Sequence, residues 1–242
     1  MKYRTYINIT NRCTYACPFC CMFSSPKNKT DMGLSTFYAI LQDIQRKHTE
    51  DPAITFEVQI EGGEPLLHPD LYLFLEMLTS QMMKPIVDKI IIDTNGALLM
   101  DAIDKIVEIA ERKQTDILLK ASINGYILKK RPDAIEVYKN IDSSLEFVPH
   151  VDLRFNVRYY DDIERDVLIE KIGRLKDKSS IFSFNAYGRL DDHPTLPKPI
   201  IKKETKDWWC YACDGRNFGE DLEARSKAEL EIARKEVSHE NA

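Results

Sequence analysis

The sequence predicts an α/β fold: a partial (β/α)6 TIM-like barrel with parallel strands, plus a short C-terminal extension ending in a helix. Two observations predict this fold. Short segments rich in β-branched and aromatic residues alternate along the chain with segments whose apolar residues recur at helical spacing. Polar or glycine-rich motifs follow the carboxyl ends of several of these strands, which form the functional face of parallel barrels. Because eight strands close such a barrel, six should leave it open on one side.

Six strands and five intervening helices can be placed in order. The expected strands are short apolar or alternating runs over 5–9, 56–60, 90–92, 117–119, 153–157 and 181–184. The expected helices carry an apolar stripe at helical spacing over 35–44, 69–82, 99–110, 134–145 and 163–175. The continuous isoleucine run 90–92 indicates a strand buried on both faces. On the fifth strand, Asn156 and Arg158 alternate with apolar residues, so they should point into the barrel.

The chain is expected to divide into a barrel over residues 1–190 and an extension over residues 191–242. A proline-rich run over 194–199 predicts an extended connector between the two. Aromatic residues follow it, and this surface should dock on the barrel and border its open rim. In the last segment, Ser226 and Glu229 have the spacing of a capping box, which predicts a terminal helix packed on the barrel or on a partner.

The composition of the chain argues against several classes of function. The 242 residues carry 34 basic and 39 acidic side chains, for a net charge of −5, and both signs are mixed along the chain. This balance argues against a dedicated nucleic-acid surface. No apolar run approaches the roughly 20 residues that a membrane span needs. The chain starts without an apolar signal segment and its cysteines are clustered, so we expect a cytoplasmic protein with reduced thiols.

Three cysteines near the start form the motif around which the rest of the chain is organised. Cys13, Cys17 and Cys20 are separated by three and then by two residues. This spacing is suited to hold three corners of an iron–sulfur cube, which leaves one iron open to a substrate or cofactor. A structural zinc site would need a second close pair of ligands, and none lies nearby in the sequence. A disulfide is a weaker interpretation, because the iron–sulfur cube already accounts for the spacing and nothing in the sequence suggests secretion.

With the aromatic Phe19 just before its third cysteine, this motif resembles the signature of the radical SAM superfamily. The resemblance covers about residues 1–190 and implies the same partial barrel. It also implies a [4Fe-4S] cluster whose open iron binds S-adenosylmethionine (SAM). In such enzymes an electron from an external flavodoxin- or ferredoxin-like donor cleaves SAM. The resulting 5′-deoxyadenosyl radical then removes a hydrogen atom from the substrate.

A glycine-rich turn with a carboxylate, Gly62-Gly63-Glu64, follows the second strand. Two glycines at a strand end suit a backbone that approaches a ligand closely. The resemblance implies that this turn contacts the amino group of SAM, with Glu64 at the rim facing the ammonium. The alternative is an ordinary strand-to-helix turn that happens to be rich in glycine.

Further strand ends carry polar candidates for cofactor contact. Thr94 and Asn95 follow the third strand and could line the ribose of SAM or support the loop. The resemblance makes Ser122, at the end of the fourth strand, a candidate for the SAM carboxylate. Arg158 could pair with a carboxylate of the cofactor, with the substrate or with a neighbouring aspartate. Polar residues also occur at strand ends simply because the chain turns there.

The extension contains a Cys-x-x-Cys pair, Cys210 and Cys213, beside Trp208, Trp209 and Tyr211. Family members that modify peptides often carry such an extension with cysteines for auxiliary clusters. Outside the first motif only Cys21, Cys210 and Cys213 remain, and a cluster held by cysteines alone needs four. The pair is therefore expected to be structural or redox-active, or a second metal site completed by another ligand.

The sequence thus predicts a radical SAM enzyme that acts on a peptide or protein side chain. That choice of substrate rests on the open barrel and on the short extension. The Asp-Thr-Asn-Gly motif at 93–96 also resembles glycyl-radical-enzyme activases, and a nucleoside or small-metabolite enzyme is a further alternative. The non-enzymatic alternative is a binding module that uses its metal for stability only.

Overall fold

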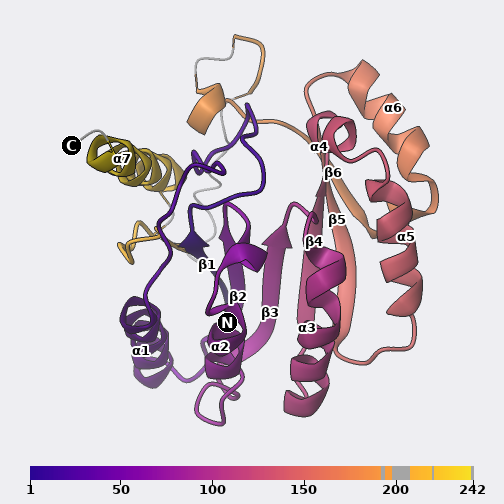
Figure 1. Ribbon diagram of the computed structural model, residues 1–242. Helices are drawn as coiled ribbons and strands as arrows, with labels where there is room; N and C mark the ends of the chain where they lie inside the picture. Colours follow the sequence, from indigo (N-terminus) through magenta and orange to yellow (C-terminus); the bar gives the residue numbers. More distant parts are fainter. Residues whose placement is uncertain (192–193, 198–207, 220, 241–242) are drawn as a thin grey trace.

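The computed structural model describes residues 1–191, 194–197, 208–219 and 221–240. Its centre is one parallel sheet of seven strands in the order β6-β5-β4-β3-β2-β1-β7 (Figure 1). The strands are β1 (Lys2–Thr10), β2 (Thr55–Gly62), β3 (Val87–Thr94), β4 (Ile117–Ile123), β5 (Val151–Tyr159), β6 (Ser179–Ser183) and β7 (Trp208–Tyr211). The sheet does not close on itself, because β6 and β7 are its two edges. The predicted open, parallel α/β fold is therefore confirmed.

Helices connect the strands and cover the outer face of the sheet (Figure 1). They are α1 (Leu34–Glu50), α2 (Leu71–Leu78), α3 (Leu99–Lys113), α4 (Gly125–Lys130), α5 (Ala134–Ser144) and α6 (Asp162–Ile172). A further helix, α7 (Leu222–Glu240), follows the last strand. Three 3-10 turns, η1 (Pro65–Leu67), η2 (Gly173–Lys178) and η3 (Gly188–Leu190), complete the connections. The short helix α4 was not predicted. It begins where the side chain of Asn124 accepts a hydrogen bond from the N–H of Ile127 at 2.9 Å.

The two faces of the sheet differ in chemistry. The outer face is apolar and packs against the helices, through residues such as Val58, Ile60, Ile90, Ile92, Leu119, Leu153 and Phe155. Alternate positions point to the inner face, where many side chains are polar or charged, such as Gln59, Glu61, Asp93, Lys120, Asn156 and Arg158. The isoleucine run 90–92 contributes to both faces, because Ile91 lines a cavity at the amino end of the barrel. The inward orientation predicted for Asn156 and Arg158 is confirmed.

The C-terminal extension adds a strand that the sequence did not reveal. Strand β7 pairs in parallel with β1, with Cys210 beside Tyr6 and Tyr211 beside Ile7. The hydroxyl of Tyr211 donates to the carboxylate of Asp43 in α1 at 2.6 Å, so the extension docks on the barrel as predicted. The end of the predicted connector (198–199) and the side chains of Trp208 and Trp209 lie outside the described residues.

Helix α7 follows β7 and lies beside the loop after β1 (Figure 1). The capping box predicted at Ser226 and Glu229 is wrong, because α7 begins four residues earlier, at Leu222. The carboxylate of Asp221 accepts from the N–H of Ala224 at 2.8 Å and caps this end instead. Ser226 and Glu229 lie inside the helix and are buried against the rest of the molecule.

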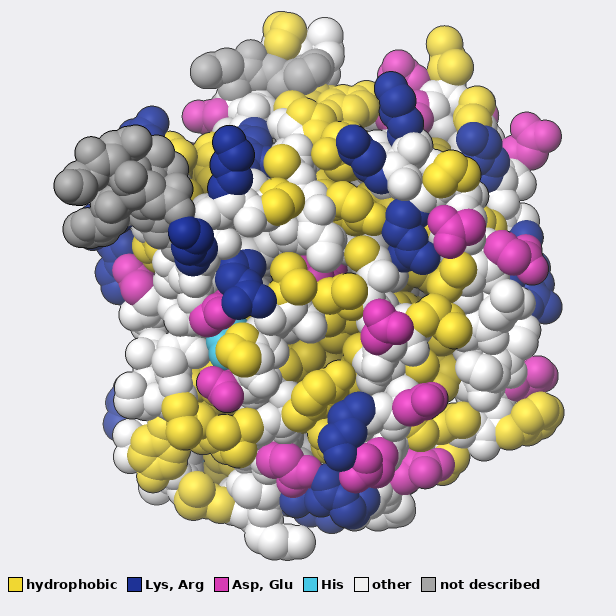
Figure 2. Space-filling view, viewed as in Figure 1, with side chains coloured by type: hydrophobic (Ala, Val, Ile, Leu, Met, Phe, Trp, Pro, Cys, Tyr) yellow, Lys and Arg dark blue, Asp and Glu magenta, His cyan; other side chains and the backbone are white. Residues whose placement is uncertain are grey.

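The surface mixes both charges. Figure 2 shows basic and acidic side chains interspersed over one face of the molecule, without a large area of either sign. None of the helices in the described ranges is long and apolar enough to cross a membrane.

Candidate active site

A cavity of about 480 Å³ lies at the carboxyl ends of the strands, where the sequence motifs were expected to meet. Its wall contains residues from each of the strands β1 to β6 and from helix α7. The predicted site residues that line it are Cys13, Cys17, Phe19, Cys20, Gly62, Gly63, Thr94, Asn95, Ser122 and Arg158. Glu64, Cys210 and Cys213 are not part of this wall.

The cysteine loop, residues 11–25, connects β1 to the segment before α1 and carries the three predicted cluster ligands. Cys13 is buried, and its sulfur lies 3.5 Å from both the N–H of Tyr15 and the side-chain amide of Asn95. Burial raises the pKa of Cys13 to about 12. Burial and then the neighbouring Cys20 and Cys13 raise the pKa of Cys17 to about 12, although Arg189 acts in the opposite direction. Binding of iron at these thiols would therefore release their protons.

The donor set of the loop fits an iron–sulfur cluster. Within the described ranges, no three His, Cys, Asp or Glu side chains are close enough together to hold a single metal ion. The thiols of Cys13, Cys17 and Cys20 instead border a shared cavity. Cysteine thiolates are the usual ligands of iron–sulfur clusters, and three of them leave one corner of a cube for another ligand.

Glu64 does not occupy the rim position that the sequence predicted, because the residue is 0% exposed. Its carboxylate accepts hydrogen bonds from the hydroxyl of Thr94 at 2.7 Å and from the N–H groups of Asn95 at 2.8 Å and Leu66 at 3.2 Å. Burial raises the pKa of Glu64 to about 7, against the effect of these donors. Glu64 thus ties the end of β2 to the end of β3. It can act on a ligand in the cavity only through the residues that it holds.

The structure explains why glycine occupies the two positions before Glu64. A Cβ on Gly63 would lie 2.1 Å from the carbonyl oxygen of Arg12, and one on Gly62 would lie 2.5 Å from that of Thr10. The N–H of Gly63 donates to Thr10 and the N–H of Glu64 donates to Arg12, both at 2.8 Å. The end of β2 therefore runs directly against the backbone that leads into the cysteine loop. Both glycines still border the cavity, so the structural and the cofactor interpretations are compatible.

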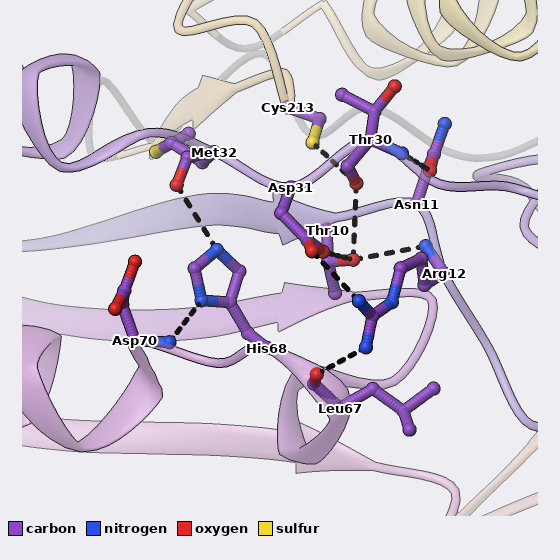
Figure 3. Close-up of polar contacts among 10 residues, drawn as sticks. All are labelled: Thr10, Asn11, Arg12, Thr30, Asp31, Met32, Leu67, His68, Asp70 and Cys213. Carbon is purple, nitrogen blue, oxygen red and sulfur yellow. Dashed lines mark hydrogen bonds and ion pairs between the residues drawn. The ribbon is translucent and has the colours of Figure 1, made fainter. Parts of the chain in front are cut away.

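An ion pair fixes the start of the cysteine loop (Figure 3). The carboxylate of Asp31 accepts from the hydroxyl of Thr10 at 2.6 Å and from the guanidinium of Arg12 at 3.0 Å. The other terminal nitrogen of Arg12 donates to the carbonyl oxygen of Leu67 at 2.6 Å. Sequence analysis missed Arg12 and Asp31, because no spacing rule relates them to the cysteines.

Charged residues make the cavity more polar than the motifs predicted. Glu61, Asp93 and Lys120 line it beside Arg158, and Arg225 enters it from α7. A terminal nitrogen of Arg225 lies 2.5 Å from Glu61, and these side chains are only 7% and 13% exposed. Burial and then Glu61 raise the pKa of Asp93 to about 6. Alternation along the strands could have revealed Glu61, Asp93 and Lys120, whereas no local pattern points to Arg225.

Phe19 in the cysteine loop packs against the segment that follows β6. Its ring centroid lies 4.2 Å from that of Phe184 and 6.1 Å from that of Tyr126. Tyr160 contacts both phenylalanines, with centroids 6.3 Å from Phe19 and 4.7 Å from Phe184. The aromatic residue of the motif therefore anchors the loop and also borders the cavity.

The second cysteine pair is buried and does not line the cavity. Cys210 and Cys213 are 0% and 2% exposed, and neither is part of a disulfide bond. The sulfur of Cys213 contacts the carbonyl oxygen of Thr30 at 3.7 Å (Figure 3). The N–H of Cys213 donates to the carboxylate of Glu229 at 2.9 Å. In the part of the chain that the structure describes, neither thiol belongs to a group of three potential metal ligands.

The family model of the Radical SAM superfamily matches residues 7–145. Two relatives have related sequences. The S-adenosylmethionine-dependent nucleotide dehydratase of Selenomonas ruminantium is 31% identical over 101 residues, which cover 42% of this chain and 32% of that protein. The GTP 3',8-cyclase of Campylobacter jejuni subsp. doylei is 28% identical over 197 residues, which cover 76% of this chain and 58% of that protein.

Solved structures show the same fold. SuiB of Streptococcus suis, in its complex with the precursor peptide SuiA, superposes with a TM-score of 0.56 at 20% identity. The match covers 78% of this chain and 41% of SuiB. The chain thus spans less than two thirds of each relative, and the family implies SAM and an iron–sulfur cluster as cofactors. Because the family model covers more than half of the chain, the protein belongs to the radical SAM superfamily.

Proposed function

We propose that the chain is a radical SAM enzyme that holds a [4Fe-4S] cluster on Cys13, Cys17 and Cys20 and cleaves SAM reductively. The observation that carries this proposal is the position of the three thiols in the wall of one cavity at the strand ends. When bound, the cluster and SAM supply the radical that removes a hydrogen atom from the substrate. An external one-electron donor of the flavodoxin or ferredoxin type would supply the electron.

The remaining wall offers groups that suit SAM. Gly62 and Gly63 present backbone beside the cysteine loop, and the side chains of Thr94, Asn95 and Ser122 add hydroxyl and amide groups. Glu64 would act as a positioning residue, since it holds the hydroxyl of Thr94 and the N–H of Asn95. Arg158 provides a cation for a carboxylate, either of the cofactor or of the substrate.

The proposed substrate is a peptide or protein side chain. The sheet remains open between its edges β6 and β7, so the cavity is not enclosed by a complete barrel. The inner face presents both acidic and basic side chains, which suits a peptide with polar groups of both signs. The structural relative SuiB is known with a precursor peptide bound, which supports the same substrate class.

A nucleotide is the second candidate substrate. The two sequence relatives are named for reactions on nucleotides. Lys120 and Arg158 lie in the cavity and could pair with phosphate oxygens. A nucleotide should therefore bind less tightly to variants that lose either cation.

Iron content and SAM cleavage test the proposal. Anaerobically reconstituted protein should bind about four irons per chain and form 5′-deoxyadenosine from SAM under dithionite. Replacement of Cys13, Cys17 and Cys20 by alanine should abolish both. The matched control replaces Cys210 and Cys213, which lie outside the cavity. Retention of the cluster spectrum in the triple variant, or loss of about four irons in the control, would overturn the assignment of ligands.

Substrate class is tested by stimulation of SAM cleavage. The reconstituted enzyme would be incubated with GTP or with peptides encoded by short reading frames beside its gene. A substrate should raise the rate of 5′-deoxyadenosine formation and appear with an altered mass. Stimulation by GTP alone would replace the peptide proposal by the nucleotide one.

A further inference from the structure

Backbone carbonyl groups of the cysteine loop receive hydrogen bonds from residues that lie far along the chain. An irregular loop cannot pair its own polar groups as a helix or strand does, so it needs outside partners. The loop does contain local bonds, such as that from the N–H of Cys20 to the carbonyl of Cys17 at 3.3 Å. The same carbonyl of Cys17, and further carbonyls of the loop, also accept hydrogen bonds from residues of η3 and α7, which lie beyond the family match at 7–145.

Arg189 in η3 spans the loop. One terminal nitrogen of its guanidinium donates to the carbonyl oxygen of Cys17 at 2.7 Å. The other donates to the carbonyl oxygen of Ser24 at 2.9 Å. The backbone N–H of Arg189 adds a third bond, to the carbonyl oxygen of Cys20 at 3.2 Å. The rigid fork of an arginine can hold two separate carbonyls at once, which a lysine ammonium cannot do with the same geometry.

Ser226 in α7 holds the next residue of the loop. Its hydroxyl donates to the carbonyl oxygen of Cys21 at 2.7 Å. Gly188 lies against the same residue, because a Cβ at this position would come within 2.4 Å of the Cα of Cys21. Gly188 has φ +65°, a backbone conformation that glycine adopts without strain. Carbonyls on both sides of the Cys17–Cys20 turn are therefore fixed by the C-terminal part of the chain.

We propose that Arg189 and Ser226 form a clamp that holds the cysteine loop in the shape needed to bind its cluster. The inference rests on the proposed function, because it concerns the same three thiols. Both are positioning residues, since they contact loop carbonyls and not the thiols. A loop that is already ordered loses less conformational entropy when it binds a ligand, so the clamp should slow release of the cluster.

Variants of Arg189 test the clamp against a matched control. Arg174, an exposed arginine, also donates to a main-chain carbonyl, that of Lys139 at 3.2 Å, and to the hydroxyl of Ser143 at 2.7 Å. We expect Arg189→Ala to release iron to a chelator roughly tenfold faster than the wild type, from the loss of two hydrogen bonds. Arg174→Ala should release it at the wild-type rate. Arg189→Lys should release iron at an intermediate rate, because one of the two carbonyls loses its side-chain donor.

Thermal unfolding of cluster-free and cluster-loaded protein distinguishes an effect of Arg189 on cluster binding from an effect on the stability of the fold. Cluster loading should raise the midpoint of thermal unfolding in the wild type and in Arg174→Ala, because the cluster binds only the folded chain. This gain should shrink in Arg189→Ala, while its cluster-free midpoint stays near that of Arg174→Ala. Equal gains in both variants would overturn the clamp. A wild type that binds no iron would instead overturn the proposed function.

A milder pair of variants keeps the proposal testable if Arg189→Ala does not fold. Ser226→Ala removes one bond to the loop, and Ser144→Ala removes a similar bond, from its hydroxyl to the carbonyl of Ile141 at 2.8 Å, far from the loop. We expect Ser226→Ala to speed iron release roughly threefold and Ser144→Ala to leave it unchanged. Identical release rates in these two variants would refute the role of Ser226.

Discussion

The outer and the inner face of the sheet carry different kinds of side chain, although both belong to the same strands. On β5, Phe155 packs outward into the core, while its neighbour Asn156 points inward and donates to Asp93 at 3.1 Å. A closed barrel fills its interior with layers of branched apolar side chains. Here the interior borders two cavities, of about 480 and 540 Å³, and carries polar and charged side chains beside apolar ones. Helix packing thus specifies the fold on one face and leaves the other available for chemistry.

The largest effect is expected on the outer face. Phe155 is 1% exposed, and its ring centroid lies 5.5 Å from that of Tyr138. Phe155→Ala should lower the free energy of unfolding by about 3–5 kcal/mol, because it leaves a cavity in a packed core. Denaturant unfolding of the cluster-free chain measures this loss. A change below about 1 kcal/mol would mean that the outer face is less tightly packed than the structure indicates.

The ion pair between Glu61 and Arg225 departs from this difference between the faces, because it is an inner-face contact that is nearly buried. Burial by itself lowers the pKa of Arg225, but Glu61, together with Cys210, Cys21 and Glu229, outweighs it and the pKa is raised. Glu61→Gln should therefore cost about 3 kcal/mol by leaving Arg225 buried without its partner. The double variant Glu61→Leu with Arg225→Met should recover much of that loss, and additive losses would contradict a coupled pair.

Asp93 gives the inner face a pH dependence that the outer face lacks. Burial raises its pKa from 3.8 to about 6, so the folded chain holds this proton more tightly than the unfolded chain does. Its contribution to stability is therefore present below about pH 4 and is lost as the pH rises to about 6. Asp93→Asn should reduce the fall in unfolding free energy between pH 4.5 and 8 by about 1–2 kcal/mol. Parallel pH profiles of variant and wild type would show that Asp93 does not titrate in this range.

The smallest effect on stability is expected for Arg158. Its guanidinium lies 4.8 Å from the ring centroid of Phe182 and borders the cavity. Arg158→Gln should change the unfolding free energy by less than about 1 kcal/mol. The same variant should bind SAM or substrate at least tenfold more weakly, since it loses a charge-assisted contact. Unchanged affinity for both, by calorimetry, would leave Arg158 without a role in the site.

The features of the fold that depend on local pattern and chain order could be predicted from the sequence. Strands β1 to β6 were visible from their apolar runs, and the βα alternation placed the cysteine loop and Ser122 at one rim. Strand β7 was missed because it is four residues long, and its pairing with β1 is a long-range contact. The burial of Glu64 was missed for a similar reason, since it depends on donors of the next strand. Arg189 and Arg225 act at positions that no spacing rule connects to the cysteines.

The pairing of β7 with β1 also has a consequence for synthesis. Arg4 pairs with Trp208, so the strand that leads into the cysteine loop gains its second neighbour only after the ribosome has translated most of the chain. Contacts between such distant segments form late and slowly. The same delay applies to Arg189 and Ser226, which reach the loop only after they leave the ribosome. Insertion of the cluster should therefore be a post-translational event, and a nascent chain halted before residue 189 should not retain iron.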